Sequence, residues 1–132
     1  MKSSFDILDR VYKLLNVTQI TSLITGGVWR RQAKNTSNGK YITINTIPQN
    51  AGDYPLQEGV VIVNAYARDH EDGTPDESSL RSMSDAVMTL IEAHNATSEY
   101  FALSVSSDNI YPDDSNPGVS YLSLRVNYII EK

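Results

Sequence analysis

Residues 60–94 decide the fold, and they read VVIVNAYARDHEDGTPDESSLRSMSDAVMTLIEAH. The segment Val60–Arg68 is rich in β-branched residues and predicts a strand, whose nearly unbroken apolar start indicates a central place in a sheet. Residues 75–94 carry apolar side chains at three- and four-residue spacing, which predicts the longest helix of the chain. We expect Thr74 to cap this helix and Pro75 to be its first residue.

Patterns on both sides of this unit predict further strands and a second substantial helix. A helix over 4–15 is predicted by an apolar stripe of Phe5, Leu8, Val11, Tyr12 and Leu15, and Ser3 followed by Asp6 indicates a capping box at its start. The remaining expected elements are a short helix over 19–24 capped by Thr18, a strand beginning at Val28, and strands over 41–47, 100–106 and 119–130. One face of the last strand is expected to carry Leu122, Leu124, Val126, Tyr128 and Ile130. A single long helix between runs of strands is typical of the α+β class. We therefore expect one domain, 1–132, with a mostly antiparallel sheet of four to five strands and the long and N-terminal helices packed on one face.

The composition excludes several kinds of site. The 132 residues include no cysteine and two histidines, which excludes disulfides, thiol nucleophiles, cysteinyl zinc sites and multi-histidine metal sites. The sequence also lacks a nucleophile elbow, a Walker loop and a dinucleotide-binding glycine motif. We expect no cofactor, no metal and no enzymatic activity.

Two acidic stretches are weaker candidates for chemistry. His70 lies among Asp69, Glu71 and Asp72, where it could act as a general base or help bind a divalent cation. A solvated loop explains the same residues, and a predicted loop over 108–118 explains Asp108, Asp113 and Asp114 through turn formation. His94 near the end of the long helix is favourable there as a cation.

Charge is divided unevenly along the chain. Residues 10–52 contain six basic residues and no acid, whereas residues 53–132 contain fourteen acids and four basic residues, and the net charge is −5. The division could reflect ordinary charged loops, complementary patches used in self-assembly, or a basic surface that faces DNA.

Two groups of residues are the candidate interfaces. The basic segment consists of Arg30, Arg31, Lys34 and Lys40, within a long polar connection of the kind that is often functional. The acidic loop consists of Asp69, Glu71, Asp72, Asp76 and Glu77. Each group could contact a neighbouring subunit or another partner.

No part of the sequence indicates a membrane protein. Asp6, Asp9 and Arg10 interrupt any signal-peptide core, and the longest aliphatic run has four residues, against about 20 for a membrane span. We expect synthesis in a host cytoplasm and no membrane partner.

The order of these elements resembles the tail completion, or tail terminator, proteins of long-tailed bacteriophages. The matching segments, in chain order, are 7–15 (ILDRVYKLL), 20–24 (ITSLI), 26–29 (GGVW), 41–47, 61–67 (VIVNAYA), 75–94, 109–113 (NIYPD) and 121–126 (YLSLRV). The sequence departs from the family in one respect, because Pro48 follows the 41–47 strand, whereas the family has a proline before it.

The resemblance implies a virion protein that caps the head-proximal end of the tail tube as a ring, typically a hexamer. The implied partners are further copies of the chain, the tail tube protein and a neck or head-completion protein, with DNA passing through the lumen. Ring contacts join unlike patches, so the basic segment could reach the acidic loop of the next subunit.

Two alternatives stay open. A neck or head-closure connector occupies the same joint of the virion. A small acidic inhibitor or binding protein would be monomeric and would expose the acidic loop. An enzyme would need a pocket that brings His70 to a carboxylate.

Overall fold

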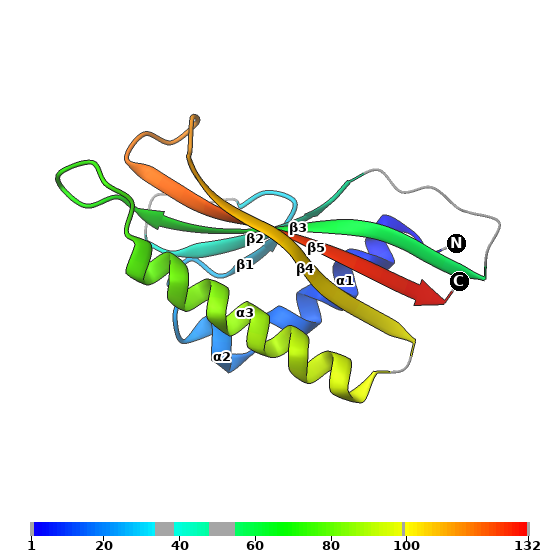
Figure 1. Cartoon of the computed structure of the whole chain (residues 1–132). Helices are drawn as coiled ribbons and strands as arrows, with labels where there is room; N and C mark the ends of the chain where they lie inside the picture. Colours follow the sequence, from blue (N-terminus) through cyan, green and yellow to red (C-terminus); the bar gives the residue numbers. More distant parts are fainter. Residues whose placement is uncertain (1, 34–38, 48–54, 99, 132) are drawn as a thin grey trace.

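The computed structural model describes residues 2–33, 39–47, 55–98 and 100–131. Within them, five strands form one sheet in the order β1-β2-β3-β5-β4, accompanied by three helices (Figure 1). The elements are α1 (Ser4–Leu15), α2 (Thr18–Thr21), β1 (Val28–Arg30), β2 (Tyr41–Thr46), β3 (Leu56–Arg68), α3 (Glu77–Thr97), β4 (Phe101–Pro112) and β5 (Val119–Glu131). The β1–β2 pair is parallel and the other three pairs are antiparallel. The expected α+β class with a mostly antiparallel sheet is confirmed.

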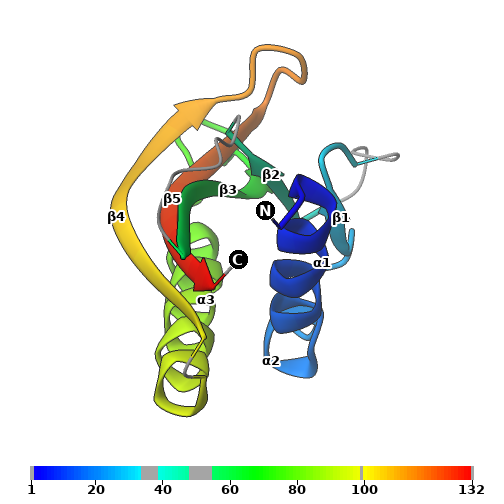
Figure 2. The ribbon, with the colours of Figure 1, turned by 90° about the vertical axis from the view of Figure 1, so that its right-hand side faces the viewer.

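Helices α1 and α3 lie on the same face of the curved sheet (Figure 2). The core forms between them and the sheet, because side chains on one side of each strand are buried there. The expected stripe of β5 is buried as predicted: Leu122, Leu124, Val126, Tyr128 and Ile130. The central position expected for β3 is also confirmed, since β3 pairs with β2 on one side and β5 on the other.

The start of α1 agrees with the sequence, but its apolar stripe does not agree throughout. The Ser3 hydroxyl accepts from the Asp6 amide and the Asp6 carboxylate accepts from the Ser3 amide, so the expected capping box is present. Phe5, expected in the buried stripe, is 71% exposed, and Ile7 is buried instead. The Phe5 ring lies beneath the guanidinium of Arg31, 5.4 Å from its centroid.

Both other helices begin at residues different from those predicted. Helix α2 ends at Thr21, and Val17 stands at its N-cap without a side-chain hydrogen bond, so Thr18 is not the cap. Helix α3 begins at Glu77, because the Asp76 carboxylate caps it by accepting from the Ser79 amide. The predicted cap Thr74 therefore lies outside the helix, where its hydroxyl and amide both donate to Asp72.

Strands β3 and β4 are longer than the sequence pattern indicates. β3 begins at Leu56, and its thirteen residues pair in continuous register with β5. β4 continues to Pro112, so the predicted loop over 108–118 is wrong for its first five residues, Asp108 included. Asp108, Asn109 and Pro112 in this part have low β propensity, and pairing with β5 beyond a bulge between Val105 and Ser107 holds them in the strand.

A close approach in the middle of the sheet requires glycine at position 59. A Cβ there would lie 2.4 Å from the hydroxyl oxygen of Tyr128, its partner on β5. The Tyr128 hydroxyl accepts from the amide nitrogen of Gln57, a side chain that is 1% exposed. Gln57 also exchanges hydrogen bonds of 2.8 and 3.0 Å with the backbone of Lys2, which ties the N-terminal segment to β3.

Candidate subunit interface

Two members of the basic segment lie against α1 of their own chain. The Arg30 guanidinium pairs with the Asp9 carboxylate and lies over the Tyr12 ring, 4.9 Å from its centroid. Both partners of the ion pair keep about half of their side-chain surface exposed, at 52% and 50%. The contact therefore leaves room for a second partner from outside.

Arg31 is held in an unusual backbone conformation. Its φ of 70° lies in the left-handed region, which non-glycine residues rarely adopt. The Arg31 amide donates to the Ile44 carbonyl at 2.7 Å, and its guanidinium donates to the Ser4 hydroxyl at 3.2 Å. These bonds and the Phe5 contact fix the direction of the side chain.

The other two residues of the basic segment are Lys34 and Lys40. Lys34 lies outside the described residues. Lys40 precedes β2, and its carbonyl accepts from the amides of Thr25 and Gly26. The positive charge of Lys40 is one of the influences that lower the pKa of Asp76, after the hydrogen bonds from Ser79 and the His70 charge. Lys40 thus acts on the acidic loop of its own chain.

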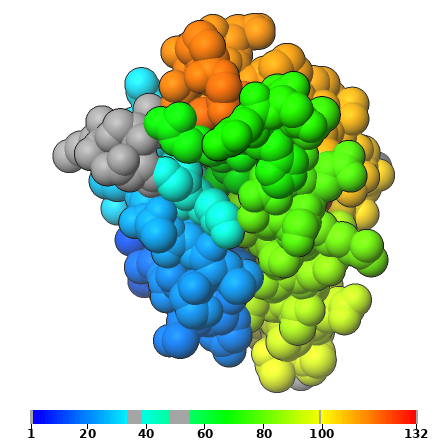
Figure 3. Space-filling view, turned by 90° about the vertical axis from the view of Figure 1, so that its left-hand side faces the viewer, coloured from blue at the N-terminus to red at the C-terminus, as the bar shows by residue number. Residues whose placement is uncertain are grey.

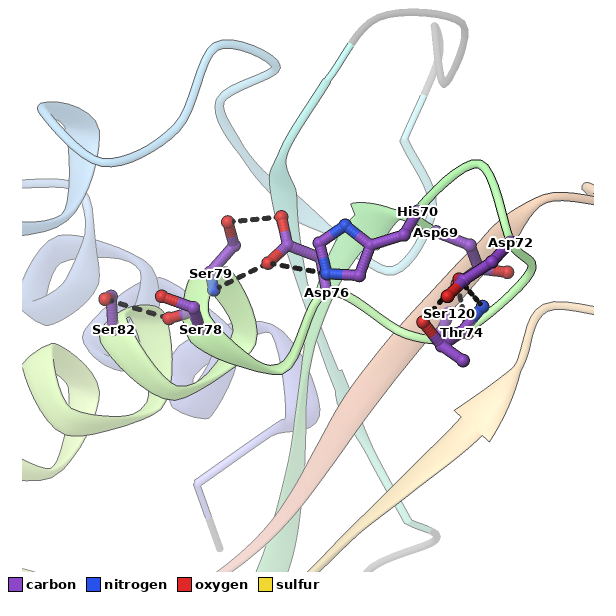
Figure 4. A network of polar contacts seen from close by, with 9 residues as sticks. All are labelled: Asp69, His70, Asp72, Thr74, Asp76, Ser78, Ser79, Ser82 and Ser120. Atoms are coloured by element: carbon purple, nitrogen blue, oxygen red, sulfur yellow. Dashed lines mark hydrogen bonds and ion pairs between the residues drawn. The ribbon is translucent and has the colours of Figure 1, made fainter.

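The acidic loop joins β3 to α3 and extends beyond the end of the sheet, at the left of Figure 1. Three of its carboxylates accept hydrogen bonds from nearby hydroxyls, as Figure 4 shows. Asp69 accepts from Ser120 at 2.6 Å, Asp72 from Thr74 at 2.6 Å, and Asp76 from Ser79 at 2.7 Å. Glu71 and Glu77 are exposed. The loop therefore combines fixed carboxylates with two outward-facing ones.

Hydrogen bonding keeps two of these carboxylates ionised. Hydroxyl and amide donation from Thr74 lowers the pKa of Asp72, and donation from the Ser79 hydroxyl and amide lowers the pKa of Asp76. Seen from this end of the molecule, the loop (green) and the β4–β5 turn (orange) lie on one surface (Figure 3). That surface carries negative charge at neutral pH.

The histidines do not form a catalytic arrangement within the described residues. His70 is exposed, and its Nε2 lies 3.9 Å from Asp76, beyond hydrogen-bond distance. Nε2 of His94 donates to the Phe101 carbonyl at 2.7 Å, which is a structural contact between α3 and β4. Among these residues, no group of three or more His, Asp and Glu side chains could hold a metal ion.

A row of tyrosines crosses the face of the sheet opposite the helices, and sequence patterns did not reveal it. Tyr41, Tyr66, Tyr121 and Tyr111 are successive cross-strand partners on β2, β3, β5 and β4. Their ring centroids are 4.4, 5.1 and 5.6 Å apart. Burial, with smaller effects from Tyr66 and Asp113, raises the pKa of Tyr41 to about 12. The row could not be predicted from the sequence, because it depends on how four strands align with one another, and no single stretch of sequence determines that alignment.

A shallow hollow next to the tyrosine row connects it to the basic segment. The hollow has a volume of 330 Å³, and Arg31, Tyr41, Tyr66 and Asp113 are among its lining residues. The Asp113 carboxylate also accepts from the amide and hydroxyl of Ser115, as expected for a turn residue. Arg31 therefore lies near the β4–β5 turn as well as α1.

The described residues form an α+β fold with a basic and an acidic surface. Among solved structures, the chain is similar to one from the virion of a native gene transfer agent particle, with a TM-score of 0.66, 12% identity and 92% of both chains covered. It is also similar, with a TM-score of 0.48 and 9% identity, to the type 4 fimbrial biogenesis protein PilO from Pseudomonas aeruginosa, over 99% of this chain and 73% of that one. No family model and no curated protein matches the chain. At 12% identity, the likeness to the gene transfer agent chain establishes the fold alone.

Among the described helices, none has both the length and the apolar character needed to cross a membrane.

Proposed function

We propose that this chain is a non-enzymatic structural protein of the virion of a tailed bacteriophage or a related particle. In this role, copies form a ring, sixfold as in the family that the sequence resembles, on the head-proximal end of the tail tube and join the tail to the head. The observation that carries the proposal is the fold shared with a gene transfer agent virion chain over 92% of both proteins. The order of elements that resembles tail terminator proteins supports the same role.

The proposed ring contact joins the basic segment of one subunit to the acidic loop of the next. Arg30 and Arg31 have directions fixed by α1, and both remain exposed. Glu71 and Glu77 are exposed on the acidic loop, beside carboxylates that stay ionised. Such complementary charges fix the register of a heterologous contact and accelerate encounter.

The test is assembly by a charge-reversed variant. The double variant carries Lys34→Glu and Lys40→Glu. It leaves Arg30 and Arg31 unchanged, so their contacts with α1 are kept. We expect the double variant to fold, to lose the ring mass seen by light scattering at low salt, and to bind purified tail tubes at least about tenfold more weakly, since several charge pairs become repulsive.

Lys13→Glu is the matched control, because Lys13 is an exposed basic residue at the end of α1 and outside the basic segment. The control should assemble normally. Normal assembly by the Lys34 and Lys40 variant would contradict the interface. Failure of the unchanged protein to bind tail tubes would contradict the virion role itself.

A further inference from the structure

The outer edge of β4 is covered along its first half by α3. Nε2 of His94 donates to the Phe101 carbonyl. The Asn95 side chain donates to the Leu103 carbonyl at 2.6 Å and accepts from the Leu103 amide at 3.0 Å. Asn95 therefore pairs with Leu103 as the backbone of another strand would.

The second half of the edge lacks such a cover. Backbone groups of alternate residues point to opposite sides of a strand, so those of Val105 point outward like those of Leu103. Beyond the bulge the alternation shifts by one residue. The Asp113 amide donates inward to Val119, which places Asp108, Ile110 and Pro112 on the outward side. Pro112 fits there, because its missing N–H is not needed for the pairing with β5.

Among the described residues, no strand pairs with this part of β4. The outward amide of Ile110 has the side chain of Asn109 as an acceptor, at 2.9 Å. The outward groups of Val105 and Asp108 have no such side-chain partner in the described part of the chain. An extended polypeptide is the ligand that matches a row of alternating outward donors and acceptors.

The surroundings of this edge indicate what side chains the polypeptide carries. Between α3 and β4 lies a hollow of 340 Å³, with apolar walls that include Leu80, Met88 and Ile110. Its rim carries the carboxylates of Glu77, Asp85 and Asp108 against a single guanidinium, that of Arg81, 3.8 Å from Asp85. Lysine or arginine fits both parts, since the stem covers apolar surface and the head reaches the carboxylates.

We infer that the β4 edge from Val105 to Ile110 is a strand-addition site for an extended basic segment of another protein. Two copies of this chain would pair less well there, because antiparallel β4 strands would bring two Asp108 carboxylates and two acidic rims together. The inference is independent of the proposed ring, which uses other residues.

A short peptide of alternating lysine and valine is the probe. Its binding should slow hydrogen exchange at the amides of Val105 and Asp108, and leave the Leu103 amide, already bonded to Asn95, unchanged. A peptide of equal charge that is N-methylated at every backbone nitrogen should not bind. Equal binding of the methylated peptide, or no slowing of exchange at Val105 and Asp108, would overturn the inference.

Two substitutions at one position separate backbone pairing from charge. Asp108→Asn removes the charge and keeps the N–H, so we expect a loss of a few-fold in peptide affinity at low salt. Asp108→Pro also removes the outward N–H, and the loss should reach at least about tenfold. Equal losses would indicate charge attraction alone. A dimer of the unchanged protein that Asp108→Pro dissociates would identify a second copy as the occupant and overturn the assignment to another protein.

Discussion

The two edges of the sheet differ in length, charge and cover. At the β1 edge the strand has three residues, the Arg30 carbonyl already accepts from the Gln32 amide at 2.9 Å, and two arginines lie against α1. At the β4 edge the strand has twelve residues, and Asp108 is its one charged side chain. Helix α3 covers the first half of that strand through His94 and Asn95.

The difference shows two ways of limiting unwanted strand pairing. A very short edge strand with charged side chains resists pairing by itself, as natural sheets commonly do. A long, nearly neutral strand needs a cover, and here the cover ends at Leu103. The open part of β4 is therefore a local exception within a sheet whose other edge surfaces are protected.

The largest expected effect comes from disrupting the β3–β5 pair, which connects the two halves of the sheet. Gly59→Ala would place a Cβ against the Tyr128 ring, and we expect a loss of about 3 kcal/mol in the free energy of unfolding from overpacking. Urea denaturation measures it. Gly118→Ala is the comparison, because no atom lies within 4 Å of its added Cβ and the cost comes from its φ of 85° alone. Equal losses would contradict the close approach.

A smaller change tests the β1 edge. Arg30→Met removes the ion pair with Asp9 and the contact of the guanidinium with Tyr12, and we expect a loss of about 1 kcal/mol because both groups are half exposed. Denaturation at low and high salt should show the loss shrinking as salt increases. Arg81→Met should cost less, because the side chains of Arg81 and its partner Asp85 on α3 are 85% and 67% exposed. If Arg30→Met accelerated hydrogen exchange at β4 as much as at β1, relative to the unchanged protein, the separate protection of the two edges would be contradicted.

The smallest expected effect concerns the N-cap of α3, the helix that forms one wall of the hollow beside β4. The pKa of Asp76 is lowered in the fold, so its cap stabilises α3 above the ordinary pKa of 3.8 and is lost as the pH falls through the lowered value. An NMR titration of the Asp76 carboxyl carbon should give a midpoint below 3.8. Ser79→Ala should move the midpoint back toward 3.8, because the Ser79 hydroxyl donates to Asp76. Ser82→Ala should leave the midpoint unchanged, because the Ser82 hydroxyl donates to the Ser78 carbonyl instead. A midpoint that Ser79→Ala leaves in place would show that the hydroxyl is not the cause.

Sequence patterns predicted which helices and strands exist better than they predicted the residues at which these elements begin and end. Apolar periodicity identified α1, α3 and the face of β5, because burial on one side imposes that spacing directly. The start of α3 differs from the prediction because Thr74 and Asp76 are both competent caps by residue type, and in the structure Asp76 is the one that accepts from a helix amide, that of Ser79. The second half of β4 was missed because pairing with β5, rather than its own residues, makes it a strand.

The sequence predicted which charged residues form the two candidate interfaces. The structure adds where the described side chains lie and what they contact. Nothing in the sequence indicates that Arg30 lies against Tyr12 or that Lys40 influences Asp76, because these contacts join residues distant along the chain. The Asn95–Leu103 pairing has no local signal either, since asparagine near a helix end is ordinary. Such contacts follow from tertiary packing alone.

The unequal edges also set how many partners the sheet can take. A chain with one accepting edge and no matching second edge is monovalent in strand pairing, so one addition leaves no site for the next. Addition at β4 would then give a complex of fixed stoichiometry instead of a growing fibre. The three-residue length of β1 therefore limits growth of the sheet at that edge.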